Sequence, residues 1–458
     1  MKRTLQAAAA AVGGRLVGDD RPYAMVSTDS RTLSAGALFV ALRGPNFDGG
    51  QFVAAAAARG AIGAIVDRLV TDAPEAAALP QVVVNDTQKA LQGLATAWRG
   101  EFKIPIVAVA GSNGKTTTKE MTAAILSRRG TCLATHGNLN NHIGVPLTLM
   151  RLEASCQSAV IEMGANRRGD VAELVRMVKP KVAIITNAGA EHLEGFGDIQ
   201  GVAEGEGEAV ANLDPTATAV INADDAFAQF WRGLAQKSPV LTFGVNQPAD
   251  FSARHSVQAI ERGEFATRFT LVCPLGERDI KLAAGGAHNI ANALAAAAAA
   301  SAAGATLDDI AGGLADFRAV SGRLQLKASV GGSWLIDDSY NANPSSVRAG
   351  LDVLRAVSGP TWLVLGDMAE LGTYSEDSHA QMGSYARACG VKRLFALGQL
   401  SSRAAETFGA GAEWFPDADS LIRRLQGELS SGVTVLIKGS RVNRLERVVQ
   451  SLMSNTGG

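Results

Sequence analysis

One stretch constrains the fold of this chain more than any other: Gly111-Ser112-Asn113-Gly114-Lys115-Thr116-Thr117-Thr118. It follows an apolar run at residues 104–110 that has the length of a buried strand. It opens a helical pattern at residues 116–129, which ends at Gly130. A strand, a glycine-rich turn and a helix in this order form the setting of a phosphate-binding loop. The sequence therefore predicts an α/β nucleotide-binding domain around these residues.

The residues of this loop suit a nucleoside triphosphate. Glycines let backbone N–H groups turn toward phosphate, and a helix start adds partial positive charge. The Lys115 ammonium would neutralise the β and γ phosphates, and the Thr116 hydroxyl would reach Mg²⁺. The strict GxxxxGK[ST] pattern needs glycine at position 109, where Val109 stands, so this is a shortened form and a chance glycine-rich turn is the alternative. The other residues of the loop predicted to contact the nucleotide are Gly111, Ser112, Asn113, Gly114 and Thr117.

Composition narrows the class of protein. At ~100–200 residues per domain, 458 residues predict three domains, and 47% hydrophobic residues allow each a sizeable core. A net charge of -1 argues against a dedicated nucleic-acid binder or a polybasic membrane anchor. The 4 cysteines are scattered without a CxxC pair, which indicates reduced thiols in a cytosol-like compartment and no zinc or disulfide framework.

Three α/β regions follow one another. A small α/β unit at residues 1–84 precedes a regular alternation of strand, loop and helix at residues 85–320, and a third series of the same kind fills residues 321–458. Such alternation predicts mostly parallel sheets covered by helices. The alanine-rich run at residues 292–305 is expected to be a tightly packed helix and no membrane span, because alanine supplies little hydrophobic drive.

Polar residues follow two of the predicted central strands. The strand at residues 158–162 ends in Glu162, and the strand at residues 182–186 precedes His192. Because ligands bind beyond the carboxyl ends of parallel strands, both side chains are expected near the phosphate loop. Glu162 is a suitable oxygen ligand for Mg²⁺. The alternatives are a capping or surface glutamate and a structural histidine.

Further short motifs accompany these features in a fixed order. They are Ser27-Thr28-Asp29-Ser30-Arg31, Gly137-Asn138-Leu139-Asn140-Asn141, Glu162-Met163-Gly164-Ala165, Thr186-Asn187-Ala188-Gly189, His288-Asn289-Ile290-Ala291-Asn292, Asp337-Asp338-Ser339-Tyr340-Asn341-Ala342-Asn343-Pro344, Leu365-Gly366-Asp367-Met368-Ala369-Glu370-Leu371-Gly372 and Lys438-Gly439-Ser440-Arg441. With the phosphate loop and His192, they make nearly the whole chain resemble the Mur ligase family of ATP-dependent amide-bond ligases. Each motif is only moderately specific, but their joint order and spacing make coincidence very improbable.

The resemblance implies three α/β domains and one reaction. Residues 1–84 would form a UDP-sugar-binding domain, residues 85–320 a central P-loop ATPase, and residues 321–458 a Rossmann-like domain that binds the incoming dipeptide. The motifs look most like those of the member that joins D-alanyl-D-alanine to UDP-N-acetylmuramoyl tripeptide through an acyl phosphate, in peptidoglycan precursor synthesis. The implied cofactors are ATP and Mg²⁺. The implied protein is a cytoplasmic monomer without a nucleic-acid or membrane partner.

The family also implies roles for single residues. The catalytic residues would be Lys115, Glu162 and His192, and the metal ligands Thr116, Glu162, His192 and Glu206. The UDP-sugar peptide would contact Ser27, Thr28, Asp29, Ser30, Arg31, Asn138, Asn140 and Asn141. Adenine would lie against Asn289 and Asn292, with Arg323 and Asp338 reaching the nucleotide from the last domain. More weakly, the dipeptide is assigned to Asn341, Asn343, Asp367, Glu370, Lys438 and Arg441, which could equally be strand-end residues.

One position departs from the family pattern. Many relatives carry a carbamylated lysine in a Lys-x-Lys-Gly-Glu stretch, where this chain reads Glu204-Gly205-Glu206-Gly207-Glu208. Glu206 takes the lysine position and supplies a similar carboxylate, so we hypothesise that it binds a second Mg²⁺ directly or through water. The alternative is an acidic, solvated helix start, and the two glycines weaken any helix there.

Two other functions remain open on the sequence. The sister ligase that adds the third amino acid typically carries an Asp-Asn-Pro-Arg-like motif, in place of which residues 365–372 stand here. A catalytically inert nucleotide-binding regulator would keep the loop, but the retained Lys115, Glu162, His192 and Asp338 argue against it. The segment at residues 27–31 argues against folylpolyglutamate synthase, a more distant relative.

Overall fold

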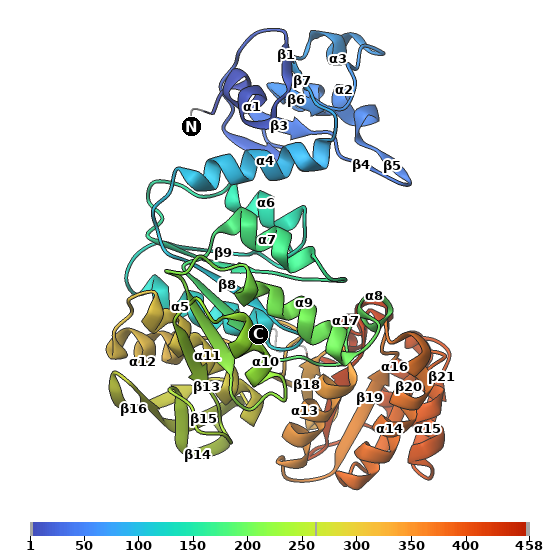
Figure 1. Cartoon of the computed structure of the whole chain (residues 1–458). Coiled ribbons are helices and arrows are strands. Elements are labelled where there is room, and N and C mark those ends of the chain that lie inside the picture. The colour runs from blue at the N-terminus through green and yellow to red at the C-terminus, as the bar shows by residue number, and fades with distance from the viewer. Residues whose placement is uncertain (1–2, 262, 455–458) are drawn as a thin grey trace. The chain divides into compact units, whose positions relative to one another are not determined.

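The computed structural model describes residues 3–261 and 263–454, so the outermost residues of the predicted first and last domains lie outside the described part (Figure 1). The chain divides into two compact units. The first comprises Met1–Ala108, Gly130–Gly164 and Asp170–Lys181, and the second comprises Val109–Arg129, Ala165–Gly169 and Val182–Gly458. Within the described ranges, no helix is both long and apolar enough to cross a membrane.

The first unit begins with a five-stranded sheet in the order β1-β7-β6-β3-β2. All neighbours are parallel except β1 and β7. Its strands are β1 (Arg15–Val17), β2 (Met25–Ser27), β3 (Ala37–Val40), β6 (Gly63–Val66) and β7 (Gln81–Val83), with a hairpin of β4 (Arg43–Gly44) and β5 (Phe47–Asp48). The helices are α1 (Leu5–Val12), α2 (Val53–Ala58), α3 (Pro74–Ala78) and α4 (Thr87–Gly100). Every residue of β3 and β6 is buried, as expected for central strands of a parallel sheet.

The central sheet has the strand order β13-β12-β11-β8-β10-β9. Its strands are β8 (Ile106–Ala110), β9 (Cys132–Ala134), β10 (Ser158–Glu162), β11 (Val182–Ile185), β12 (Thr218–Asn222) and β13 (Val240–Phe243). Its helices are α5 (Lys115–Ser127), α6 (Gly144–Leu149), α7 (Asp170–Val178), α8 (Leu193–Phe196), α9 (Ile199–Ala211) and α10 (Ala228–Leu234). The pairs β9–β10, β11–β12 and β12–β13 are parallel, which agrees with the predicted sheet type.

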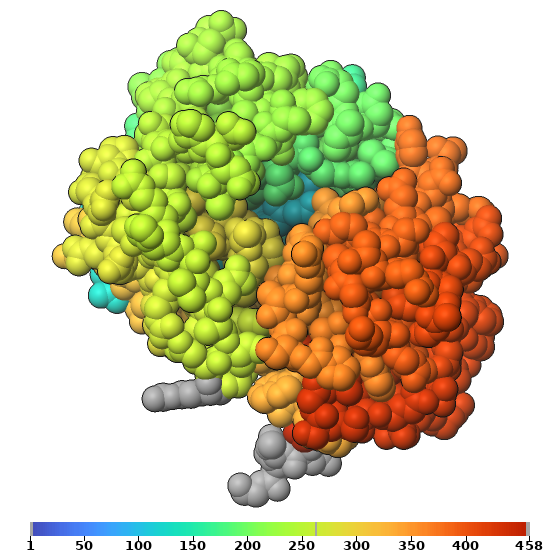
Figure 2. Space-filling view, turned by 90° about the horizontal axis from the view of Figure 1, so that it is seen from below, coloured from blue at the N-terminus to red at the C-terminus, as the bar shows by residue number. Residues whose placement is uncertain are grey.

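The second unit contains an antiparallel sheet that the sequence patterns did not predict. It consists of β14 (Ser252–Glu261), β15 (Glu264–Cys273) and β16 (Gly276–Leu282). β15 contacts β17, so this sheet borders the C-terminal strands, and Figure 2 shows the two parts in yellow-green and orange. The following helices are α11 (Ala287–Ala302) and α12 (Leu307–Asp316). Helix α11 is the expected packed alanine helix: its small side chains are buried and it contacts α5.

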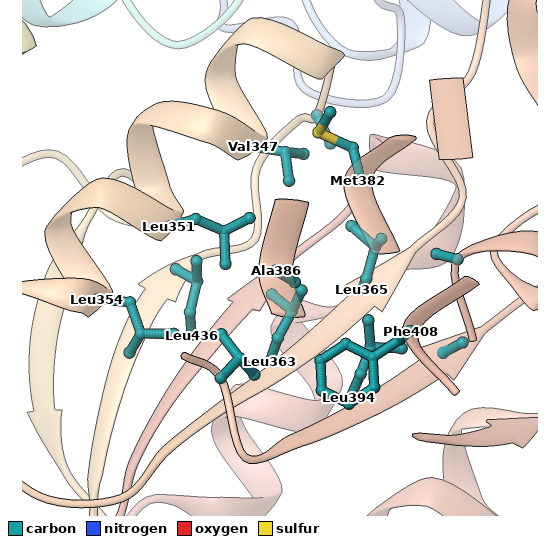
Figure 3. Close-up of a cluster of buried hydrophobic side chains, with 14 of the residues drawn as sticks. Val347, Leu351, Leu354, Leu363, Leu365, Met382, Ala386, Leu394, Phe408 and Leu436 are labelled. Carbon is teal, nitrogen blue, oxygen red and sulfur yellow. The ribbon is translucent and has the colours of Figure 1, made fainter. Parts of the chain in front are cut away.

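The C-terminal sheet is parallel except for its first pair, in the order β17-β18-β22-β19-β20-β21. Its strands are β17 (Gln325–Ala328), β18 (Trp334–Asp338), β19 (Thr361–Gly366), β20 (Arg393–Leu397), β21 (Ala412–Phe415) and β22 (Thr434–Lys438). The helices are α13 (Pro344–Arg355), α14 (Ser375–Ala388), α15 (Ser402–Phe408), α16 (Ala418–Glu428) and α17 (Glu446–Leu452). Alternate strand residues enter two buried clusters, one of which holds Leu351, Leu363 and Phe408 (Figure 3). The whole is the predicted α/β fold.

Candidate active site

The phosphate loop links β8 to α5 and has the backbone that the sequence predicts. Gly111 (φ 116°) and Gly114 (φ 82°) both adopt left-handed conformations, which favour glycine. A Cβ on Gly111 would lie 2.2 Å from Oγ1 of Thr186, and a Cβ on Gly114 would lie 2.3 Å from Oδ1 of Asn292. Both positions therefore need glycine for conformation and for space.

Lys115 folds back over this loop. Its Nζ donates to the carbonyl oxygens of Gly111 (2.5 Å) and Ser112 (2.9 Å) and pairs with the Glu191 carboxylate at 3.1 Å. Both charged side chains are largely buried, so solvent screens the pair only weakly. A phosphate group in the loop would compete with Glu191 for the lysine.

Glu206 approaches the same loop from α9. Its Oε2 accepts the N–H of Gly111 at 2.6 Å, and the residue is 1% exposed. Burial raises the pKa of Glu206 to about 7, although the Lys115 ammonium acts in the opposite direction. The alternative of a solvated helix start is wrong for Glu206, because α9 begins seven residues earlier at Ile199 and buries this side chain.

The glycines beside Glu206 do not break α9. A Cβ on Gly205 would lie 2.4 Å from the Phe196 ring, and a Cβ on Gly207 would lie 2.6 Å from Leu234. The expected loss of helix stability is offset by close packing that only glycine permits. Packing therefore places the Glu206 carboxylate at the loop.

The segment after β11 holds the loop in place. Asn187 accepts the N–H of Asn113 through its side chain (3.0 Å), and its own carbonyl accepts the N–H of Ser112 (2.9 Å). The Ser112 hydroxyl accepts the N–H of Gly189 at 2.8 Å. The backbone of the phosphate loop is therefore fixed by residues more than 70 positions away in the sequence.

Asn289 and Asn292 lie on one face of α11, as their spacing predicts. Asn292 Oδ1 accepts from the Thr118 hydroxyl (3.2 Å), and its Nδ2 donates to Asn289 (3.0 Å), which in turn donates to the carbonyl of Gly285 (2.7 Å). Both are buried. The chain of amides supports α5 next to the loop, while adenine contact stays a prediction.

The C-terminal part of the second unit reaches the loop at two places. Arg323 donates to the Thr116 hydroxyl at 2.9 Å, and its guanidinium stacks 4.5 Å from the Tyr340 ring centroid. Asn343 donates to Asn113 at 2.9 Å, and Asn113 donates to Ser345 at 3.0 Å. Asn343 also caps α13. The Asn343 side chain thus contacts the phosphate loop, and its assignment to the dipeptide stays a prediction.

Asp338 and Lys438 form a buried ion pair with Nζ and Oδ2 2.5 Å apart. Lys438 also donates to the carbonyl of the exposed Asn341 at 3.0 Å. Nearby, burial lowers the pKa of His288 to about 4, against the attraction of Asp338. The ribose and dipeptide roles of this group stay predictions.

The other predicted dipeptide residues divide into two kinds. Asp367 accepts the N–H of Ser401 at 2.7 Å, which is a structural bond next to α15, and Arg441 is exposed and pairs with Glu446 at 3.2 Å. Glu370 instead lies against His192, with Oε2 and Nδ1 2.5 Å apart. The Glu370 contact links the loops that follow β19 and β11.

In the first unit, Glu162 ends β10, and its side chain is buried. Its N–H donates to the Thr135 hydroxyl at 3.0 Å, and its Oε1 accepts from Asn140 at 2.9 Å. Its Oε2 is buried without a hydrogen-bond partner in the structure. A buried carboxylate oxygen without a donor is costly, so a cation beside Oε2 would fit this position.

Other residues of the first unit are predicted to contact the UDP-sugar peptide, and among them Asn141 and Asp29 hydrogen-bond to near neighbours in the sequence. Asn141 accepts the N–H groups of Ile143 and Gly144 at the start of α6, and Asn138 is exposed. Asp29 holds Arg31 through two hydrogen bonds of 3.0 and 2.8 Å, and the Arg31 guanidinium lowers the pKa of Asp29 to about 2. Ser30 is buried and Thr28 half-buried.

Three of the predicted metal ligands are distributed over separate elements of the second unit: Thr116 on α5, His192 before α8 and Glu206 on α9. Across residues 3–261 and 263–454, no three His, Cys, Asp or Glu side chains gather as a ready metal site. The orphaned oxygen of Glu162 is the observation that fits a metal.

Comparison with known proteins identifies the family. Residues 22–99 match the model described as Mur ligase family, catalytic domain; residues 109–300 match the Mur ligase middle domain; and residues 322–441 match the Mur ligase, glutamate ligase domain. The chain belongs to the Mur ligase family. It is 43% identical over 97% of both chains to the UDP-N-acetylmuramoyl-tripeptide--D-alanyl-D-alanine ligase of Escherichia coli (strain K12).

Solved structures of Mur ligases agree with the fold. MurF from Acinetobacter baumannii is 34% identical, with a TM-score of 0.90 over 98% of both chains. MurF ligase from Thermotoga maritima, in complex with ADP, is 27% identical, with a TM-score of 0.81 over 93% of this chain and 96% of that one. The resemblance drawn from the motifs is thereby confirmed.

Sequence reasoning did not assign three residues at this Mur ligase site: Asn187, Glu191 and Ser345. Asn187 and Glu191 stand in the strand-end motif before His192, so a polar residue at the carboxyl end of a parallel strand was the available signal. Ser345 follows a proline at a helix start, which predicts only a cap. Its contact with Asn113 depends on tertiary packing.

Proposed function

We propose that this chain is an ATP-dependent ligase that joins D-alanyl-D-alanine to UDP-N-acetylmuramoyl tripeptide in peptidoglycan precursor synthesis. The identity of 43% over 97% of both chains to the Escherichia coli ligase of that name carries the proposal. The phosphate loop and its buried polar surroundings support it, since they suit a reaction that begins on ATP.

The first step joins two anions. The terminal carboxylate oxygen of the tripeptide attacks the γ-phosphorus of ATP, the bond to the β-phosphate oxygen breaks, and ADP leaves. Lys115 would turn from Glu191 toward the phosphates and neutralise them, and the N–H groups of the loop would orient them. Arg323, already at the Thr116 hydroxyl, would add positive charge from the C-terminal part.

The second step forms the amide. The amine nitrogen of D-alanyl-D-alanine attacks the acyl carbon, phosphate leaves, and the amine loses a proton to a base that we do not assign. An acyl phosphate hydrolyses readily, so the site must exclude water. Domains at residues 1–84, 85–320 and 321–458, with hinges near residues 85 and 321, would close around the substrates.

Mg²⁺ is the metal we propose. When bound, it would offset the repulsion between the carboxylate and the triphosphate. The unpartnered Oε2 of Glu162 supports a role in holding it. The other proposed ligands are Thr116, His192 and Glu206, the last directly or through water. Glu206 would combine this role with its hydrogen bond to Gly111.

The remaining assignments follow the family. Ser27, Thr28, Asp29, Ser30, Arg31, Asn138, Asn140 and Asn141 would bind the UDP-sugar peptide, and Asn289, Asn292 and Asp338 the nucleoside. We propose a cytoplasmic monomer without nucleic-acid or membrane partners. The near-neutral charge supports the lack of nucleic-acid and membrane partners, and the scattered cysteines support the compartment.

The decisive experiment measures phosphate release from ATP with UDP-N-acetylmuramoyl tripeptide, with D-alanyl-D-alanine, and with both. We expect release and the pentapeptide product only with both. Release that instead needs a UDP-muramoyl dipeptide and a diamino acid would identify the sister ligase. ATP hydrolysis indifferent to all acceptors would indicate another NTPase, and nucleotide binding without turnover an inert regulator.

A further inference from the structure

Glu370 and His192 meet although they lie far apart in the sequence. His192 follows β11 in the central part of the second unit, and Glu370 follows β19 in its C-terminal part. Nδ1 of His192 lies 2.5 Å from Oε2 of Glu370. Both residues have positive φ, 49° and 63°, which non-glycine residues rarely adopt. The surrounding fold therefore holds both loops in the conformations that bring these side chains together.

The contact decides which ring nitrogen carries hydrogen. A carboxylate only accepts hydrogen bonds, and Oε2 of Glu370 lies 2.5 Å from Nδ1 of His192. Nδ1 of His192 must then be the donor. In a neutral imidazole this leaves the lone pair on Nε2, which becomes the ring's acceptor and ligand atom.

We propose that Glu370 is a positioning residue that holds His192 in the Nδ1–H tautomer and presents Nε2 to the active site. The proposal deepens the proposed function, on which it rests for the place of His192 at the site. It replaces the dipeptide role that the motif implied for Glu370. Because Glu370 belongs to the C-terminal part, the tautomer is set only when that part lies against the central part.

The two carboxylates that neighbour His192 in the sequence, Glu191 and Glu194, differ from Glu370 in partner or position. Glu191, the preceding residue, is engaged by Lys115 at 3.1 Å. Glu194 is exposed on α8, two positions after His192, and is therefore a matched control of equal charge.

The direct test is the tautomer itself, read by ¹⁵N NMR in alkaline buffer on full-length protein labelled at its 6 histidines. A His192→Gln variant assigns the signal. We expect Nδ1–H in the wild type and in Glu370→Gln, whose amide oxygen still accepts. Glu370→Met should shift His192 toward Nε2–H, and Glu194→Met should not. A wild-type signal from Nε2–H, or no change in Glu370→Met, would overturn the proposal.

Kinetics distinguish positioning from dipeptide binding. A positioning role predicts that Glu370→Met lowers kcat about tenfold while the KM for D-alanyl-D-alanine stays within about twofold. A raised KM for D-alanyl-D-alanine with retained kcat would instead assign Glu370 to dipeptide binding and overturn the positioning role. If the wild type joins no dipeptide at all, the proposed function fails, but the NMR result still decides the tautomer.

Discussion

The phosphate loop and the segment at residues 27–31 both carry predicted ligand contacts, but they are held in different ways. The loop is fixed by Thr186, Asn187 and Glu206, all distant in sequence, and it is surrounded by buried groups. In the segment, side-chain hydrogen bonds join residues two positions apart, such as Ser27 to Asp29 and Asp29 to Arg31. A loop set by tertiary contacts is preorganised before ligand arrives, whereas a locally held one can adjust to it.

The largest expected effect is at Lys115, where the constrained loop carries charge. Lys115→Ala should lower ligase kcat about 10³-fold, because one preorganised charged group at a developing charge contributes this much. Amide formation is measured by product chromatography, with the exposed Lys237→Ala as control. Normal turnover in Lys115→Ala would remove the loop from the mechanism.

The second-largest effect is expected from a change in the shape of the phosphate loop. Gly114→Ala forces a Cβ to within 2.3 Å of Asn292 and requires a left-handed alanine, so ATP affinity should fall about 10²-fold through misplaced groups. Titration with a fluorescent ATP analogue measures it. Gly427→Ala, where a Cβ meets nothing within 4 Å, is the matched helix control. Unchanged affinity would show that the loop is as adaptable as residues 27–31.

Two substitutions of Glu206 distinguish metal binding from a role in holding the loop backbone. Glu206→Gln keeps an oxygen to accept the Gly111 N–H but removes the charge, so metal binding predicts a raised Mg²⁺ requirement and about tenfold lower kcat. Glu206→Leu removes both. Near-normal Mg²⁺ response in the Gln variant, with loss only in the Leu variant, would assign Glu206 to loop geometry alone.

Burial also predicts a pH effect on stability. The pKa of His288 is lowered from 6.5 to about 4, so between these values the unfolded chain binds more protons than the folded one. Stability should therefore rise with pH through this window, by at most a few kcal/mol at roughly 1.4 kcal/mol per pKa unit. Urea unfolding should show a shallower pH slope in His288→Gln. An identical pH slope in the wild type and in His288→Gln would show that His288 does not cause the effect.

The smallest effect on stability is expected in the locally held segment. Asp29→Ala breaks an exposed pair with Arg31, which should cost less than about 1 kcal/mol. If the segment binds UDP-sugar, the KM for that substrate should still rise about tenfold, as expected when a bound ionic contact worth about 1.4 kcal/mol is lost. The exposed pair Asp19–Arg21 supplies the control Asp19→Ala. An unchanged KM would remove the segment from the UDP site.

Local sequence patterns predicted the central strands at residues 104–110, 158–162 and 182–186, the phosphate loop and the alanine helix within a few residues, because period and turn chemistry depend on near neighbours. They did not reveal the antiparallel sheet of β14, β15 and β16. Its strands interrupt an otherwise regular strand–helix alternation, and pairing partners are not encoded in the strand pattern itself.

By itself, the sequence determined the three-part α/β organisation, the place of Lys115 at a helix start, and the membership of the Mur ligase family. Only the tertiary structure decided that two glycines could remain in α9, that Glu206 is buried against Gly111, and that Asn343 contacts Asn113. The physical reason is the distance along the sequence over which each interaction acts. Backbone preference is set within a few residues, while burial and hydrogen-bond partners depend on elements that packing brings together from distant positions.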